Sequence, residues 1–122
     1  MSTVLAWGVL ALCGGSGAVL RFLPDGAVTR RFTSTLPVGT MVVNATGALA
    51  LGFLDAAALP AHLALVLGTG LIGAYTTFST WMFETQRLIE ERQNARAAQN
   101  ILLSLAVGLA AGAAGLWIGG HL

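Results

Sequence analysis

The chain has 122 residues, of which 56% are hydrophobic and only 9% are charged, and its formal net charge is +1. Soluble domains carry roughly 25% charged residues, so a soluble fold of this size would leave much apolar surface in water. The small net charge and the lack of a Lys/Arg run in the sequence give no indication of a nucleic-acid partner. We therefore expect a single domain, residues 1–122, embedded in lipid.

Four windows of the chain contain no Asp, Glu, Lys or Arg: residues 1–20, 32–54, 56–83 and 97–122. Each window reaches the ~20 residues that an α-helix needs to cross a ~30 Å hydrocarbon core. The sequence therefore predicts an all-α integral membrane protein of four transmembrane helices, at about residues 4–22, 37–55, 60–87 and 97–119.

The connections between these helices carry the charges. A polar connection is expected from Pro24 to Leu36, after the first helix. Pro37 and Pro60 suit the first turns of the second and third helices, because the missing N–H of proline would be unpaired there anyway. The charged stretch 84–96 is expected to form the exposed end of the third helix and a loop.

The arginines indicate an orientation in the membrane. Four spans place the first and third loops on one side, and all six arginines lie in or beside these two loops. Cytoplasmic loops carry an excess of Lys and Arg. The arginine-rich side is therefore predicted to be cytoplasmic, with both termini outside.

No charged residue is predicted at mid-membrane, where proton-coupled transporters usually carry an ionisable relay. A phosphate-binding loop, a metal-ligand spacing and a nucleophile with a nearby base are also missing from the sequence, so we do not expect an enzyme. The polar residues at membrane depth are uncharged. On the second helix Thr40, Asn44 and Gly47 share one face, and Asn44 is expected to meet another helix or a wet cavity.

The third helix carries the strongest pattern. Gly70 and Gly73 are followed by four hydroxyl side chains: Thr76, Thr77, Ser79 and Thr80. Gly weakens a helix by about 1 kcal/mol relative to Ala, and Thr and Ser offer backbone groups alternative partners. A break is therefore predicted at residues 73–77. Interrupted backbone at membrane depth must be buried in protein or line a cavity, where its carbonyls can bind a cation and its N–H groups an anion.

Three stretches carry a resemblance to a known family: Gly14-Gly15-x-Gly17-Ala18-x-x-Arg21, Gly39-Thr40-x-x-Val43-Asn44-x-x-Gly47 and Gly73-x-x-Thr76-Thr77-Phe78-Ser79-Thr80. They resemble the signature motifs of the Fluc (CrcB-type) fluoride channels. The resemblance implies a multi-pass protein of the bacterial cell membrane that exports fluoride passively and so relieves fluoride toxicity. It further implies an antiparallel, dual-topology dimer with two pores. The second subunit is an identical chain or a paired homologous chain, because the arginine bias differs from the balanced loops expected of a homodimer.

The resemblance also assigns roles to residues. The residues that would line the fluoride path are Thr40, Asn44, Phe78, Ser79, Thr80, Trp81, Asn100 and Ser104. Arg21 would be a basic residue near the pore vestibule. The carbonyls of Gly73 and Thr76 would hold a structural sodium ion at the dimer interface. This chain departs from the family at Trp81, where a second phenylalanine is usual, and at Asn100, where a tyrosine is usual; the last hydroxyl position of the fourth helix is Gly108.

Two other functions are alternatives to a channel. A small four-helix multidrug exporter would need an embedded carboxylate, which the first helix lacks. A non-transporting membrane assembly subunit would suit helices rich in small residues. That function leaves Asn44 and the polar cluster of the third helix without a role.

Overall fold

The structure, a computed structural model, describes residues 2–32 and 36–121. The regular structure in these ranges is helical: α1 (Thr3–Arg31), α2 (Val38–Ala56), α3 (Ala61–Ala64), the π-helix η1 (Leu65–Ile72), α4 (Gly73–Tyr75), α5 (Phe78–Glu90) and α6 (Asn94–Gly120). By length and composition, four helical stretches of the described chain could cross a membrane, and α3 to α5 together make up the third. The predicted all-α class with four spans is confirmed.

The first helix differs from the sequence expectation at its end. Residues 24–31 were expected to belong to a polar connection, but α1 continues through Pro24 to Arg31. An interior proline lacks the N–H for one helical hydrogen bond and crowds the carbonyl four residues earlier, but it does not end this helix. The helix closes where Phe32 N–H donates to the carbonyl of Val28 at 2.9 Å. Arg30 and Arg31 occupy the last turn, where cations favour the helix dipole. The expected connection is thereby shortened, and residues 33–35 within it lie outside the described ranges.

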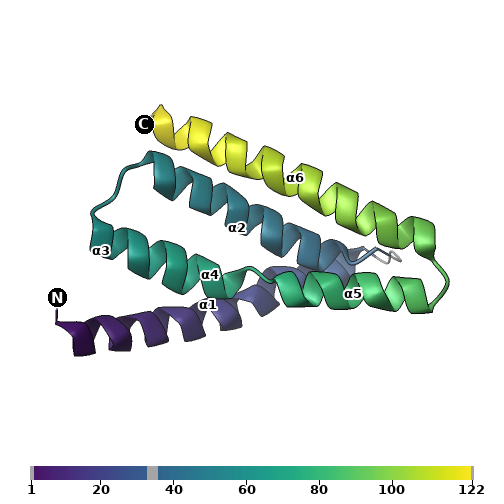
Figure 1. Ribbon diagram of the computed structural model, residues 1–122, viewed down its shortest axis with the longest axis horizontal. Coiled ribbons are helices and arrows are strands. Elements are labelled where there is room, and N and C mark those ends of the chain that lie inside the picture. The colour runs from purple at the N-terminus through teal and green to yellow at the C-terminus, as the bar shows by residue number, and fades with distance from the viewer. Residues whose placement is uncertain (1, 33–35, 122) are drawn as a thin grey trace.

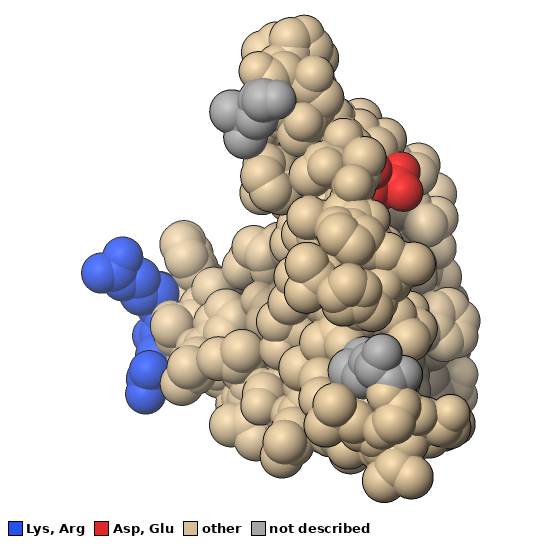
Figure 2. All heavy atoms as spheres, turned by 90° about the vertical axis from the view of Figure 1, so that its left-hand side faces the viewer, with Lys and Arg blue, Asp and Glu red and all other residues tan. Residues whose placement is uncertain are grey.

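The four spans run alternately up and down. Both chain ends and the α2–α3 connection lie at one end of the bundle, and the start of α2 and the α5–α6 connection lie at the other (Figure 1). The end that carries the termini shows few charged side chains (Figure 2). Five arginines belong to the opposite end: Arg30, Arg31, Arg87, Arg92 and Arg96.

Close helix packing depends on a few glycines. At Gly115 on α6, a Cβ atom would overlap the carbonyl oxygen of Leu49 on α2. At Gly17 on α1, it would overlap the carbonyl oxygen of Leu71 in η1. Apolar side chains gain little by leaving lipid for a neighbouring helix, so close backbone approach is a main source of helix association in membranes. These two contacts fix α6 against α2 and α1 against the third span.

The third span is unusual before its break. Its first half, which we call the first half-helix, consists of α3, η1 and α4, residues 61–75. In η1 the chain follows a π-helical course, and Gly73 N–H donates to the carbonyl of Gly68, five residues earlier. Such segments are rare and occur frequently at functional sites. No pattern in the sequence predicted this π-helix.

The chain alone has a thin core. The buried hydrophobic residues among those described are Val43, Ile72, Leu88 and Ala97, while many large apolar side chains are exposed on every span. Such a surface must be covered by lipid or by a partner chain. The fold is therefore that of a membrane protein whose outer surface is as apolar as its interior.

Substitution of Gly115 tests the packing of α6 on α2. Gly115→Ala should lower the midpoint of thermal unfolding in detergent and the free energy of unfolding by roughly 1–3 kcal/mol. The reason is that the added methyl group meets backbone that cannot move aside. Gly108→Ala on the same helix is the matched control: it gains the same helix propensity but meets no atom within 4 Å. Equal unfolding midpoints for the two variants would contradict this packing.

Candidate functional site

The third span is interrupted at two residues. Thr76 (φ −78°, ψ 160°) and Thr77 (φ −148°, ψ 120°) are extended, α4 ends at Tyr75, and α5 begins at Phe78. Thr77 caps the new helix, because Thr80 N–H donates to its hydroxyl oxygen at 3.2 Å. Thr76 bonds backward, donating its hydroxyl to the carbonyl of Ile72 at 3.2 Å. The predicted break is confirmed, and it is narrower than the predicted range 73–77.

Asn44 on α2 holds the break through a paired amide contact. Its side-chain N–H donates to the carbonyl of Thr77 at 2.8 Å, and its side-chain oxygen accepts the N–H of Thr77 at 2.8 Å. Both backbone groups of Thr77 are therefore satisfied by one side chain from another helix. One of the two N–H groups of the Asn44 amide remains available to a further acceptor.

Arg21 on α1 holds the other side of the break. Its guanidinium donates to the carbonyl of Tyr75 at 2.9 Å and also to the carbonyl of Ala74. These carbonyls end the first half-helix, where the helix dipole is negative and a cation is favoured. Close packing at Gly17, one turn earlier on α1, brings Arg21 within reach of Tyr75.

The position of Arg21 differs from the sequence expectation in one respect. The first helix was expected to end at about residue 22, which placed Arg21 at its end. Because α1 continues to Arg31, Arg21 lies well inside a span, and its contacts place it beside the helix break. It is also separated from the five arginines at the end of the bundle. The excess of arginine at that end is therefore five residues rather than the six counted from the sequence.

Thr40, Asn44 and Gly47 form a stripe on one face of α2, as their spacing predicted, and in the structure this stripe meets the third span. Thr40 donates its hydroxyl to the carboxylate of Glu84 on α5, Asn44 binds Thr77, and a Cβ atom at Gly47 would overlap the side chain of Thr76. The stripe therefore contacts both sides of the break.

Two backbone carbonyls at the break accept no hydrogen bond from the described residues. The N–H that would serve the carbonyl of Gly73 belongs to Thr77 and goes to Asn44 instead. The carbonyl of Thr76 precedes the first turn of α5, whose Thr80 N–H goes to the hydroxyl of Thr77. No backbone hydrogen bond of the described residues ends on either oxygen. Carbonyl oxygens of unwound helix are suitable ligands for a sodium ion, so these two fit the predicted sodium site.

A groove of about 350 Å³ lies beside the break, between α2 and the third span. Five of the predicted site residues line it: Asn44, Gly73, Thr76, Phe78 and Trp81. Phe78 is 70% exposed, and its ring meets that of Trp81 edge to face, with centroids 5.8 Å apart and planes at 86°. Ser79 and Thr80 follow in the first turn of α5 but do not line the groove.

The predicted residues of α6 lie behind α5, away from this groove. Asn100 is 1% exposed and donates its side-chain N–H to the hydroxyl of Thr85 at 2.9 Å. Trp81 donates its indole N–H to the backbone carbonyl of Asn100 at 3.3 Å, so this N–H is not free for an anion. The side-chain oxygens of Asn100 and Ser104 are buried and have no partner among the described residues.

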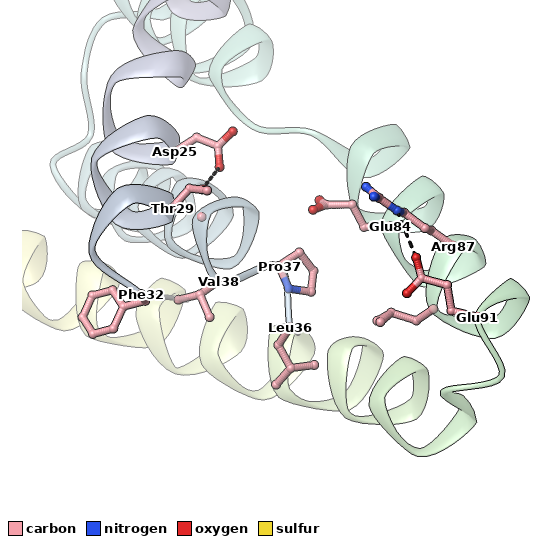
Figure 3. Close-up of a pocket in the computed structure, with 11 residues that line it drawn as sticks. Asp25, Thr29, Phe32, Leu36, Pro37, Val38, Glu84, Arg87 and Glu91 are labelled. Atoms are coloured by element: carbon pink, nitrogen blue, oxygen red, sulfur yellow. Dashed lines mark hydrogen bonds and ion pairs between the residues drawn. The ribbon is translucent and has the colours of Figure 1, made fainter. Parts of the chain in front are cut away.

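A second, polar pocket of about 320 Å³ lies at the arginine-rich end, where α1, α2 and α5 meet. The carboxylates of Asp25 and Glu84 point toward each other across it, and Arg87 pairs with Glu91 at 3.3 Å on its rim (Figure 3). Asp25 and Glu84 were not among the predicted site residues, because Asp25 was expected in a polar connection and Glu84 at the exposed end of the third helix. Glu84 could have been found from its position two turns after Thr77, because this spacing places it on the face of the helix that meets α2.

The fold and the break define a multi-pass membrane protein in which an interrupted span is held by an amide and a guanidinium from two neighbouring helices. The family described as CrcB-like protein, Camphor Resistance (CrcB), matches residues 8–116, and the chain belongs to this family. The chain is 57% identical over 116 residues to fluoride-specific ion channel FluC 2 of Mycobacterium tuberculosis (strain ATCC 25618 / H37Rv), covering 95% of this chain and 92% of the relative.

Two further relatives carry a similar name. Fluoride-specific ion channel FluC 1 of Streptomyces avermitilis is 47% identical over 105 residues, covering 83% of this chain and 85% of the relative. Fluoride-specific ion channel FluC 1 of Rubrobacter xylanophilus is 48% identical over 111 residues, covering 87% of this chain and 90% of the relative. The family suggested by the three sequence motifs is confirmed.

Removal of the Arg21 side chain tests its role at the break. Arg21→Ala leaves the carbonyls of Ala74 and Tyr75 without donors at membrane depth, so it should destabilise the protein by about 1–3 kcal/mol or more. The measurement is the thermal unfolding midpoint in detergent. Arg30→Ala, which removes an exposed arginine from the last turn of the same helix, should change it far less. An Arg21→Ala protein as stable as Arg30→Ala would show that the contact contributes little.

Proposed function

We propose that this chain is a subunit of a fluoride channel that exports fluoride passively across the bacterial cell membrane and so relieves fluoride toxicity. The observation that carries the proposal is the interrupted third span, with Asn44 and Phe78 beside it on one groove. Membership in the CrcB family and the names of the relatives support the same function. They argue against the multidrug exporter and the assembly subunit.

Neutral hydrogen-bond donors would replace the water around fluoride. Asn44 keeps one free N–H, and the N–H groups of Phe78 and Ser79 lie in the first turn of α5, where no helical acceptor exists. The N-terminus of a helix also favours an anion. The hydroxyls of Ser79 and Thr80 and the positive edge of the Phe78 ring add to this set. Thr40 lies one turn before Asn44, and its hydroxyl is paired with Glu84.

The charge of Arg21 does not hinder release in this arrangement. A free cation in a pore would bind fluoride too tightly for rapid exit, because conduction needs entry to be favourable and departure easy. The guanidinium is engaged by the carbonyls of Ala74 and Tyr75 instead. In the proposed channel Arg21 stabilises the break, and the positive charge of its guanidinium attracts anions toward the break.

The sodium site and the dimer are proposed together. The carbonyls of Gly73 and Thr76 would hold a structural sodium ion, but two oxygens fill only part of the coordination shell of such a cation. The same two carbonyls of a second subunit, inserted in the opposite direction, would complete the shell. The proposed assembly is therefore an antiparallel dimer with the sodium ion at its interface, and each subunit contributes its break to one of two pores.

Replacement of the Asn44 amide by a carboxylate tests the path. Two unit negative charges 4 Å apart repel by about 4 kcal/mol at an effective dielectric constant near 20. Each 1.4 kcal/mol changes a rate or equilibrium constant about tenfold. Asn44→Asp should therefore lower fluoride efflux from liposomes by at least about a hundredfold. Asn94→Asp, at the exposed start of α6, is the matched control and should conduct normally. Normal efflux through Asn44→Asp would remove Asn44 from the path.

Expression of the chain alone tests the identity of the second subunit. Five arginines lie at one end of the bundle and none at the other, which favours a single orientation of insertion. We therefore expect the purified lone chain to give weak fluoride efflux, and a homologous chain of opposite bias to restore it. Protease accessibility of a C-terminal tag measures the orientation. Strong efflux by the lone chain, with the tag cleaved from both sides, would establish that identical chains suffice.

A further inference from the structure

We propose that Trp81, Thr85 and Asn100 form a lock between α5 and α6 that sets the orientation of the Phe78 ring. In this role Asn100 is a positioning residue rather than a residue that contacts the ion. The inference rests on the proposed function only for its effect on fluoride flux, since the lock itself consists of contacts within one chain.

Three hydrogen bonds form a closed cycle in this lock. Trp81 donates its indole N–H to the carbonyl of Asn100 at 3.3 Å, Asn100 donates its side-chain N–H to the hydroxyl of Thr85 at 2.9 Å, and Thr85 donates to the carbonyl of Trp81 at 2.8 Å. Thr85 is 4% exposed and Asn100 is 1% exposed. Hydrogen bonds shielded from water in this way are difficult to exchange, because a buried polar group that loses its partner is costly.

The lock fixes the indole ring of Trp81 at both ends. Its backbone belongs to α5, and its five-membered ring is tied to α6 by the indole N–H. A phenylalanine, which the resemblance leads one to expect at this position, has no N–H and could not form this bond. The contact between α5 and α6 through this side chain therefore depends on the tryptophan.

Phe78 meets Trp81 directly. The two residues are three apart on α5 and so share a face of the helix, and their rings meet edge to face, within the distances preferred by aromatic pairs. The side chain of Phe78 is otherwise 70% exposed on the groove. Its backbone position is set by the Asn44–Thr77 pairing, whereas its ring orientation is set by the fixed face of Trp81.

The geometry also argues against an ion contact by Asn100. Its side-chain N–H is engaged by Thr85, and the side-chain oxygen without a partner is an acceptor, which repels an anion. The residue does not line the groove that holds Asn44 and Phe78. Its polar groups are therefore directed into the contact between α5 and α6.

The test places 4-fluorophenylalanine at position 78 and follows its ¹⁹F resonance in the purified protein, together with fluoride efflux from liposomes. Trp81→Phe removes the indole donor and keeps an aromatic ring, and Thr85→Val removes the hydroxyl and keeps the shape. Both should shift or broaden the resonance and slow efflux by up to roughly tenfold, because an aromatic pair is weakened when one ring is no longer held in place. Thr85→Ser keeps the hydroxyl and should behave like the parent protein.

Trp117→Phe is the matched control, because it makes the same substitution on an exposed tryptophan of α6 that stacks on His121. It should leave both the resonance and the efflux unchanged. If Thr85→Val does not fold, Trp81→Phe decides the question, since it removes only one bond of the cycle. An unchanged resonance in Trp81→Phe would overturn the lock while leaving the proposed channel intact. A parent protein without efflux would instead refute the channel, and the resonance would still decide the lock.

Discussion

The paired amide contact between Asn44 and the backbone of Thr77 is the interaction on which the rest of the structure depends. An unsatisfied backbone group in hydrocarbon costs several kcal/mol, so a span cannot be interrupted unless other helices supply partners. Asn44 satisfies both groups of Thr77, and Arg21 satisfies the carbonyls of Ala74 and Tyr75. α1 and α2 are therefore required for the third span to be broken at all.

The glycines of α1 and α2 make these contacts possible. Gly17 allows α1 to approach the first half-helix closely enough for Arg21 to reach its end, and Gly47 lets α2 approach Thr76. The same packing that holds the bundle together in lipid therefore also positions the polar side chains at the break. Stability and site geometry are consequently coupled, and a change in helix spacing would disturb both.

Much of this arrangement could be predicted from local pattern, and the rest could not. The spacing of Thr40, Asn44 and Gly47 predicted a shared face, and the Gly and Thr residues near position 73 predicted the break. Arg21 was placed at the end of the first helix because the charge-free window stops at residue 20, whereas α1 continues to Arg31. Its partners lie 53 and 54 residues away in the sequence, so only the fold could show that the guanidinium is satisfied by carbonyls of another span. The bond from the indole N–H of Trp81 was likewise beyond sequence pattern, because its acceptor is a backbone carbonyl on another helix.

The hydrogen-bond donors at the break are of two kinds: some are used within the protein, and others remain free. This difference accounts for how the proposed path can favour a small anion. Flexible donors would turn toward nearby carbonyls and lose their capacity to replace water, so a dehydrating site needs donors that are fixed in advance. One N–H of Asn44 is bound to Thr77, and this bond leaves the other held at a defined place beside the groove. The first N–H groups of α5 are fixed in the same way, because the hydroxyl of Thr77 caps Thr80 and so establishes the helix from which they project. In the proposed path, the bonds that are made within the protein thus determine which donors stay free for fluoride.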